Sequence, residues 1–288
     1  MALPLDFAFE GFRLIRARPR LLIPWGTVAL FGYGLAFMML VATIGPLQPL
    51  FATASLHPVD TISDAAAQRM LLMLVSVAPL WLLTSAVLAC AVCRAGLDSG
   101  KDAFGFLRFG IREIQVLAVL AATRVLAFLV MLSVVSAFQS LHLPAAFVGV
   151  GVVLGALAAA FVCIRLSLNV PQTFIQRRID LFGSVTLTRG RFWPLAAGYV
   201  MAFASTFVVQ YMAQQVIRAV IAVFFGEGTL SAAPDMSSLA AFFTPARTVD
   251  AFMTFGLVMP QVSAILLAAP LGAWKALRPS ASSLTITP

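Results

Sequence analysis

The feature that most constrains this chain is a series of six apolar runs, each about as long as a helix that crosses a membrane. A spanning helix needs about 20 mostly apolar residues to cross roughly 30 Å of hydrocarbon. Of the 288 residues, 61% are hydrophobic and 10% are charged, whereas soluble domains average about 25% charged residues. We therefore predict an all-α, polytopic membrane helix bundle of six transmembrane helices. The expected spans are residues 21–44, 70–93, 114–138, 145–164, 193–225 and 249–271.

Residues 1–275 are expected to form a single integral membrane domain, and residues 276–288 a flexible cytoplasmic tail. The first run follows a long basic segment and has no obvious small-residue cleavage site. We therefore predict a retained first span rather than a signal peptide.

The basic residues are distributed unevenly between the two sides of the predicted spans. Fifteen of the nineteen Lys and Arg residues lie in the amino-terminal segment, the second and fourth loops, and the tail. The other loops hold only Arg69 and Arg247. The positive-inside rule therefore predicts that both termini are cytoplasmic. The net charge of +8 forms no basic stripe with interleaved aromatic residues, so nucleic acid is not a predicted partner.

The basic segments carry apolar residues at helical spacing. Residues 5–18 and 101–114 each place apolar side chains opposite arginines, and Asp180 is positioned to cap a short third helix that Gly190 would end. We predict cytoplasmic amphipathic helices whose apolar sides lie among lipid headgroups and whose basic residues bind anionic lipid. The arginines of the first two segments are Arg13, Arg16, Arg108 and Arg112.

These segments also suggest internal repetition. Arg20, Arg112 and Arg191 each precede a span that begins a pair. Three units of amphipathic helix plus hairpin would explain this pattern, but membrane sequences of similar composition imitate repeats. Both interpretations stay open.

The layout resembles a known bacterial family. The resemblance is carried by the six spans, by the Phe-rich basic segment before the first, and by Arg165-Leu166-Ser167-Leu168, Pro171 and Leu187-Thr188-Arg189-Gly190-Arg191-Phe192-Trp193. These features resemble the membrane domain fused to some glycerophosphodiester phosphodiesterases and the YciC-like inner-membrane proteins. The resemblance implies a six-span fold in the inner membrane and no catalytic residue, because the chain has no room for the soluble barrel.

Arg124 is the first candidate for a functional residue, because it lies about ten residues into the third span, where a charge is costly. It could hold an anionic headgroup or substrate. Alternatively, residues 111–124 form an interfacial helix and Arg124 reaches back to the cytoplasmic surface.

The fifth run carries a polar stripe with a period of four, formed by Thr206, Gln210, Gln214 and Arg218. The stripe could line a pore, but it is more typical of helix contacts.

Prolines near the centres of two spans, Pro79 and Pro260, predict bends, which occur in transporters and in ordinary membrane helices. Gly151 and Gly155, with Ala159 on the same face, predict close packing against another helix.

No cofactor, metal or catalytic site is predicted. Cys90 and Cys93 have the spacing of a redox pair, yet nothing nearby completes a zinc site. The alternative is a cluster of His57, Asp60, Asp64 and His142 across the outer loops, and no enzyme motif supports it.

We therefore predict a non-enzymatic bacterial inner-membrane protein that binds anionic lipid and supports membrane organisation or a partner complex. A second copy or another membrane protein is a possible partner. The alternative function is a small-solute or lipid transporter with a central polar path around Arg124, Gln210, Gln214 and Arg218.

Overall fold

The computed structural model describes residues 5–44, 64–97, 104–141, 145–181, 183–231 and 234–277, and the regular elements among these residues are all helices. The elements, in chain order, are η1 (Leu5–Phe9), α1 (Glu10–Ala17), η2 (Pro19–Leu21), α2 (Leu22–Ile44), α4 (Asp64–Leu97), α5 (Ile111–Ser140), α6 (Ala145–Leu166), α7 (Asn169–Gln176), α8 (Gly183–Leu187), α9 (Phe192–Phe225), α10 (Leu239–Phe242), α11 (Pro245–Met253), the π-helical turn η5 (Thr254–Val258) and α12 (Met259–Leu277).

Six helices are long and apolar enough to cross a membrane, which confirms the predicted all-α polytopic class. Their apolar parts are Pro19–Thr43, Val75–Leu97, Ile111–Ser140, Gly149–Gln176, Phe192–Phe225 and Pro245–Leu277. Each overlaps one expected span. The helices extend beyond the apolar runs because polar residues at a helix end do not break its backbone hydrogen bonds.

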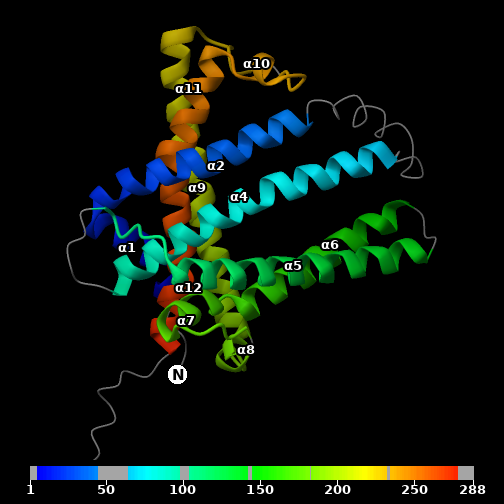
Figure 1. The fold of residues 1–288 in the computed structure, drawn as a ribbon, viewed down its shortest axis with the longest axis vertical. Coiled ribbons are helices and arrows are strands. Elements are labelled where there is room, and N and C mark those ends of the chain that lie inside the picture. Colours follow the sequence, from blue (N-terminus) through cyan, green and yellow to red (C-terminus); the bar gives the residue numbers. More distant parts are fainter. Residues whose placement is uncertain are drawn as a thin grey trace, which may run out of the picture.

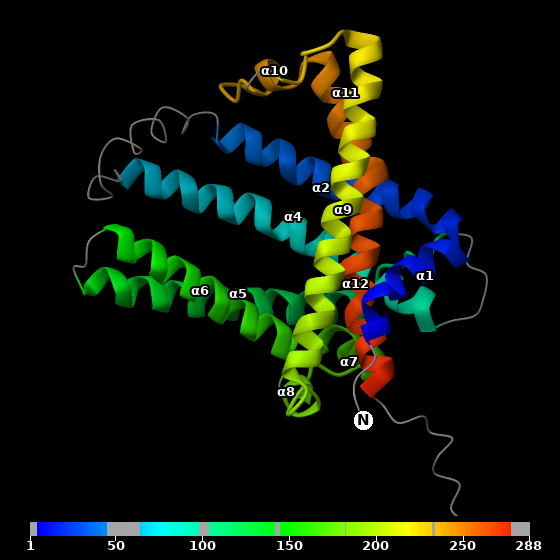
Figure 2. The same ribbon diagram turned by 180° about the vertical axis from the view of Figure 1, so that it is seen from behind.

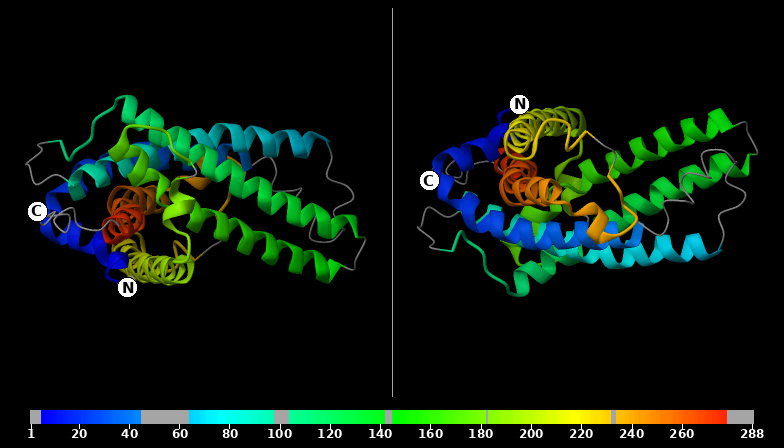
Figure 3. Two further views of the ribbon diagram at one scale, coloured as in Figure 1. Left: turned by 90° about the horizontal axis from the view of Figure 1, so that it is seen from below. Right: turned by 90° about the horizontal axis from the view of Figure 1, so that it is seen from above.

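The six helices form three antiparallel hairpins, α2/α4, α5/α6 and α9/α12 (Figure 1). The first two extend to the same side, whereas α9 and α11–α12 cross them, as the reverse view confirms (Figure 2). Seen from below or above, α9 and α12 appear nearly end-on while the other four helices are seen lengthwise (Figure 3). Spanning helices tilt by about 20° on average and rarely beyond about 40°. In this arrangement, therefore, the six helices cannot all stand close to the normal of one flat bilayer.

One end of every hairpin meets in a common region, which we call the hub. It contains the first turns of α2, α5 and α9, the last turns of α4, α6 and α12, and the short elements η1, α1, α7 and α8 (Figure 1). Most of the buried core lies here. Many of the buried residues in the last four turns of α4 have small side chains, which let neighbouring helices approach closely. These are Ala86, Ala89, Cys90, Ala91, Cys93 and Ala95.

The first amphipathic segment is helical as predicted, but it packs on protein as well as facing outward. A Cβ atom on Gly11 would lie 2.5 Å from the Cα of Ile265, and one on Gly272 would lie 3.1 Å from the Cβ of Phe7. The helix backbone therefore rests directly on α12. Leu5 and Phe9 stay exposed, so only this flank of the segment is available to the headgroup region.

The second predicted amphipathic helix is wrong over residues 104–110, which form a turn and an irregular stretch. Gly105 and Phe106 have positive φ values of 67° and 62°, which a helix does not allow. The Nε1 of Trp25 donates to the carbonyl of Gly105 at 2.8 Å, and this bond holds the loop against α2. Residues 111–114 belong instead to the first turn of α5.

The third predicted segment forms the short helix α8. Asp180 accepts a hydrogen bond from the backbone N–H of Gly183 at 2.8 Å, which is the predicted cap. Gly190 has a φ of 74° and follows the last turn, as expected for a residue that ends a helix.

The glycine face of α6 packs within the chain. A Cβ on Gly151 would lie 2.8 Å from the Cβ of Phe138, and one on Gly155 would lie 3.1 Å from the carbonyl oxygen of Met131. Both neighbours belong to α5, so the predicted contact closes the α5/α6 hairpin. Ala159 is half-buried on the same face.

The two predicted proline bends differ. Helix α4 runs without a break through Pro79, whereas the π-helical turn η5 immediately precedes α12, which contains Pro260. Proline removes one N–H and crowds the carbonyl four residues earlier, which here belongs to Gly256. A Cβ on Gly26 would lie 2.3 Å from that carbonyl oxygen. The absence of a side chain on Gly26 therefore lets α2 lie against the altered turn.

Candidate functional site: an arginine pocket at the hub

A cavity of about 390 Å³ opens at the hub where the end of α4, the start of α5 and the end of α7 meet. Four arginines line it, together with apolar and aromatic side chains. The lining residues are Arg94, Leu97, Phe106, Arg108, Arg112, Phe174, Ile175 and Arg177. We call this cavity the arginine pocket.

Arg94 is held by three contacts. It forms an ion pair with Glu113, whose side chain is only 1% exposed. It also donates to the carbonyl of Phe106 at 3.0 Å, and its guanidinium lies 5.4 Å from the ring centroid of Phe174. A buried carboxylate needs such a partner. Arg94 therefore supports the hub as well as lining the pocket.

The other arginines are positioned by the backbone and by Phe174. Arg112 lies 5.4 Å from the centroid of the same ring, within the range of a cation–π contact. Arg177 ends α7 with a left-handed φ of 54°, and its N–H donates to the carbonyl of Thr173. This left-handed turn ends the helix at the wall of the cavity.

The electrostatics favour an anion. Among the described residues, no acidic side chain lines the pocket, and Arg112 and Arg177 form no ion pair there. Clustered guanidinium groups bind phosphate or carboxylate oxygens through paired hydrogen bonds. The arrangement can therefore hold an anionic group without a metal ion.

The structure brings together two of the four predicted lipid-binding arginines. Arg108 and Arg112 lie in the arginine pocket. Arg13 lies elsewhere on α1 and pairs with Asp6 at 3.4 Å and with Glu10 at 3.9 Å. Arg16 is exposed and does not line the pocket.

Sequence reasoning missed Arg94 and Arg177, which it counted only as loop charges. The available signal was Glu113, an acidic residue at the start of an apolar run. A carboxylate in that position needs a cationic partner, and Arg94 lies at the end of the preceding span.

Arg124 lines a different cavity, of about 450 Å³, between α5, α6, α9 and α12. Helix α5 is continuous from Ile111 to Ser140, so no helix end separates Arg124 from the preceding turns. The other polar groups of this cavity include Ser167 and Tyr199, which are hydrogen-bonded to each other at 2.7 Å. Most of the wall is apolar. The cavity therefore suits an apolar chain better than a hydrated solute.

The polar stripe of α9 divides into separate contacts. Thr206 is buried and donates to its own helix at Ala202, and Gln214 donates to the hydroxyl of Thr254 in η5 at 2.8 Å. Gln210 is half-buried. Arg218 lines a separate cavity beside residues 226–231. These residues do not share one path with Arg124.

The described residues contain no group of three or more His, Cys, Asp or Glu side chains that could hold a metal ion. Cys90 and Cys93 are both buried and not disulfide-bonded. His57, Asp60 and His142 lie outside the described residues, as does the side chain of Asp64. The predicted outer cluster is therefore not described.

Comparison with known proteins assigns this chain to no family. No family model matches the chain, no curated protein matches it, and no solved structure matches it. The resemblance to the phosphodiesterase membrane domain and the YciC-like proteins stays a prediction.

Proposed function

We propose that this is a non-enzymatic membrane protein that binds the headgroup of an anionic lipid in the arginine pocket. The observation that carries the proposal is the convergence of Arg94, Arg108, Arg112 and Arg177 on one cavity of about 390 Å³. The pocket lies at the ends of apolar helices, which is the level at which a lipid phosphate meets water.

The physical basis is the match between guanidinium groups and phosphate oxygens. Each charge-assisted hydrogen bond contributes about 1.5–3 kcal/mol. Phe174 lies against two of the four guanidinium groups, which reduces the freedom they would otherwise lose on binding. A lipid so held would link α4, α5 and α7 and support membrane organisation or a partner complex.

We further propose a bacterial inner-membrane location with both termini in the cytoplasm. The support is the concentration of Arg and Lys in the segments at the hub end of the hairpins, which the positive-inside rule places in the cytoplasm.

The test is lipid retention by the full-length protein in nanodiscs that contain phosphatidylglycerol and phosphatidylcholine. After gentle release, native mass spectrometry counts the anionic lipids that stay bound. Replacing Arg112 and Arg177 with Gln should reduce retained phosphatidylglycerol about tenfold or more, because two charge-assisted contacts are lost. The matched control is Arg178→Gln, which removes an exposed charge next to Arg177 that does not line the pocket. Equal retention in all three proteins would contradict the proposal.

A second candidate function is lipid transport, favoured by the cavity beside Arg124. It combines one cation with a mostly apolar wall and lies where α5/α6 diverges from α9. Replacing Arg124 with Gln should then slow the exchange of a fluorescent anionic lipid between the leaflets of proteoliposomes. An unchanged exchange rate, or a rate equal to that of protein-free vesicles for the wild type, would argue against transport.

A further inference from the structure

A fourth cavity lies beside the last turns of α6, on the side that faces α8. It measures about 530 Å³ and shares only Leu166 with the cavity that Arg124 lines. Its walls come from α5, α6, α8 and the turn after α8. The lining residues are Leu126, Phe161, Val162, Arg165, Leu166, Val185, Thr186 and Arg189.

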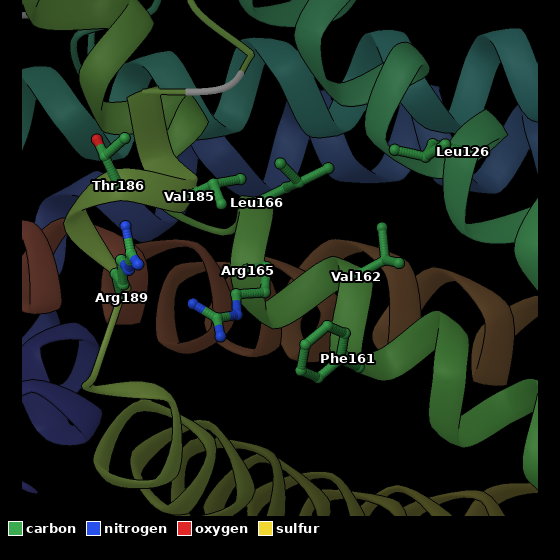
Figure 4. A pocket seen from close by; sticks show the side chains of 8 residues that line it. All are labelled: Leu126, Phe161, Val162, Arg165, Leu166, Val185, Thr186 and Arg189. Carbon is green, nitrogen blue, oxygen red and sulfur yellow. The ribbon is translucent and has the colours of Figure 1, made fainter.

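The polar and apolar side chains of this cavity are separated. Thr186, Arg189 and Arg165 gather toward one end, whereas Leu126, Val162 and Phe161 lie toward the other (Figure 4). The apolar wall continues along α6 through Leu157, which is 62% exposed. The site therefore has the two-part chemistry of a molecule with an anionic head and a hydrocarbon tail.

The cationic end is well positioned. The guanidinium of Arg165 lies 5.3 Å from the ring centroid of Phe161 and 5.7 Å from that of Phe192. The hydroxyl of Ser184 donates to the carbonyl of Arg165 at 2.8 Å, which ties α8 to the end of α6. Arg189 lies two residues after the end of α8. The two cations are therefore presented by elements that are bonded to each other.

The charge of this end is not neutralised within the described chain, because neither Arg165 nor Arg189 forms an ion pair there. We propose that the cavity binds an anionic diacyl glycerophospholipid of the membrane, its phosphate between Arg165 and Arg189 and one acyl chain over Leu126, Val162 and Phe161. This site is separate from the arginine pocket. It rests on the proposed function for the placement of the protein in a membrane, and it takes the same class of ligand at a different place.

The decisive experiment is site-resolved photolabelling of the full chain in nanodiscs. The probe is phosphatidylglycerol with a diazirine near the glycerol end of one acyl chain. After irradiation and digestion, mass spectrometry should find label on the peptides that contain Leu126 or Val162. The double variant Arg165→Gln/Arg189→Gln should reduce this label about tenfold or more, because two charge-assisted contacts are removed.

Arg191→Gln is the matched control, since Arg191 is exposed in the same loop and does not line the cavity; its labelling should equal that of the wild type. Val162→Trp, which fills the apolar end without removing charge, should also abolish the label. This second variant keeps the test valid if the double variant fails to fold.

Three results would overturn the proposal. The label could be unchanged in both the double variant and Val162→Trp. A phosphatidylcholine probe could label the same peptides equally, which would show that the net negative charge is not recognised. Glycerol 3-phosphate could compete as strongly as the lipid, which would show that the apolar end is not used. Labelling of these peptides should also persist in the Arg112→Gln/Arg177→Gln variant, so failure of the arginine pocket is distinguished from failure here.

Discussion

The α5/α6 and α9/α12 hairpins are both long and apolar, yet their packing is very different. Away from the hub, the α5/α6 hairpin is held by the contact between its own two helices at Gly151 and Gly155. Its outer faces are exposed. Helix α12 packs against α1, α2, α4, α7 and α9. Two hairpins that are both long and apolar therefore have different roles. One hairpin mainly meets its surroundings, and the other forms the centre of the protein.

The largest effect is expected from disturbing the charge pair that joins α4 to α5 at the hub. Replacing Glu113 with Leu leaves Arg94 buried without its carboxylate, and we expect a loss of about 3–5 kcal/mol in unfolding free energy. Cys90 and Cys93, both at most 1% exposed, report hub opening by their reaction with a maleimide in a Cys163→Ser background.

The double variant Arg94→Leu/Glu113→Leu is the control for this pair. It removes both charges, so we expect most of the lost stability to return. If the single and double variants react equally fast with maleimide, the pair does not hold the hub together.

A smaller loss should follow from adding one methyl group between α1 and α12. In Gly11→Ala the new Cβ meets the backbone of Ile265 and Ala264, which does not move as a side chain does. We expect a loss of about 1–3 kcal/mol, measured by the same thiol assay. Gly149→Ala is the matched control, because nothing lies within 4 Å of that position; it should be neutral or slightly stabilising. A loss equal to that of Gly11→Ala would contradict the close contact.

The peripheral hairpin should respond locally. In Gly151→Ala the new Cβ meets the Cβ of Phe138, which moves only with the backbone of α5. The hairpin must open slightly, so we expect a loss of about 1–2 kcal/mol. Hydrogen–deuterium exchange should increase along α5 and α6 beyond the hub, while exchange in α12 stays unchanged. Faster exchange in α12 as well would show that the two hairpins are not independent.

The smallest effect is expected at the surface of the hub. Lys275 pairs with Glu10 at 2.8 Å and donates to the carbonyl of Gly96 at 2.9 Å, but the pair is partly exposed. Glu10→Gln should lower stability by at most about 1 kcal/mol, and the difference should shrink in high salt. A salt-independent difference would indicate that the carboxylate is needed for packing rather than for charge.

The six long helices were predictable because each apolar run is long enough to cross a bilayer, whatever it packs against. The partner of α1 was not predictable. Gly11 and Gly272 are single residues far apart in sequence, and no periodic pattern connects them. The irregular path of residues 104–110 depends on the hydrogen bond between Trp25 and Gly105, which is a tertiary contact that overrides helical spacing.

The candidate site was predictable only in part. The amphipathic basic segments indicated anion binding by Arg13, Arg16, Arg108 and Arg112, and only the last two lie in the pocket. Their convergence with Arg94 and Arg177 depends on how the ends of α4 and α7 meet α5. Sequence spacing within one segment carries no information about such a meeting of three helices. The polar stripe of α9 is the opposite situation. Its regular spacing suggested one shared site, but its residues make several unconnected contacts.

The joining of all hairpins at one end has a mechanical consequence. Helix α5 has 30 residues and is therefore about 45 Å long. A rotation of about 5° at its anchored end displaces its far tip by about 4 Å. The hairpin thus behaves as a lever whose fulcrum is the hub. Sub-ångström adjustments around Glu113 become movements of several ångströms at the opposite end, in the part of the molecule least restrained by its neighbours.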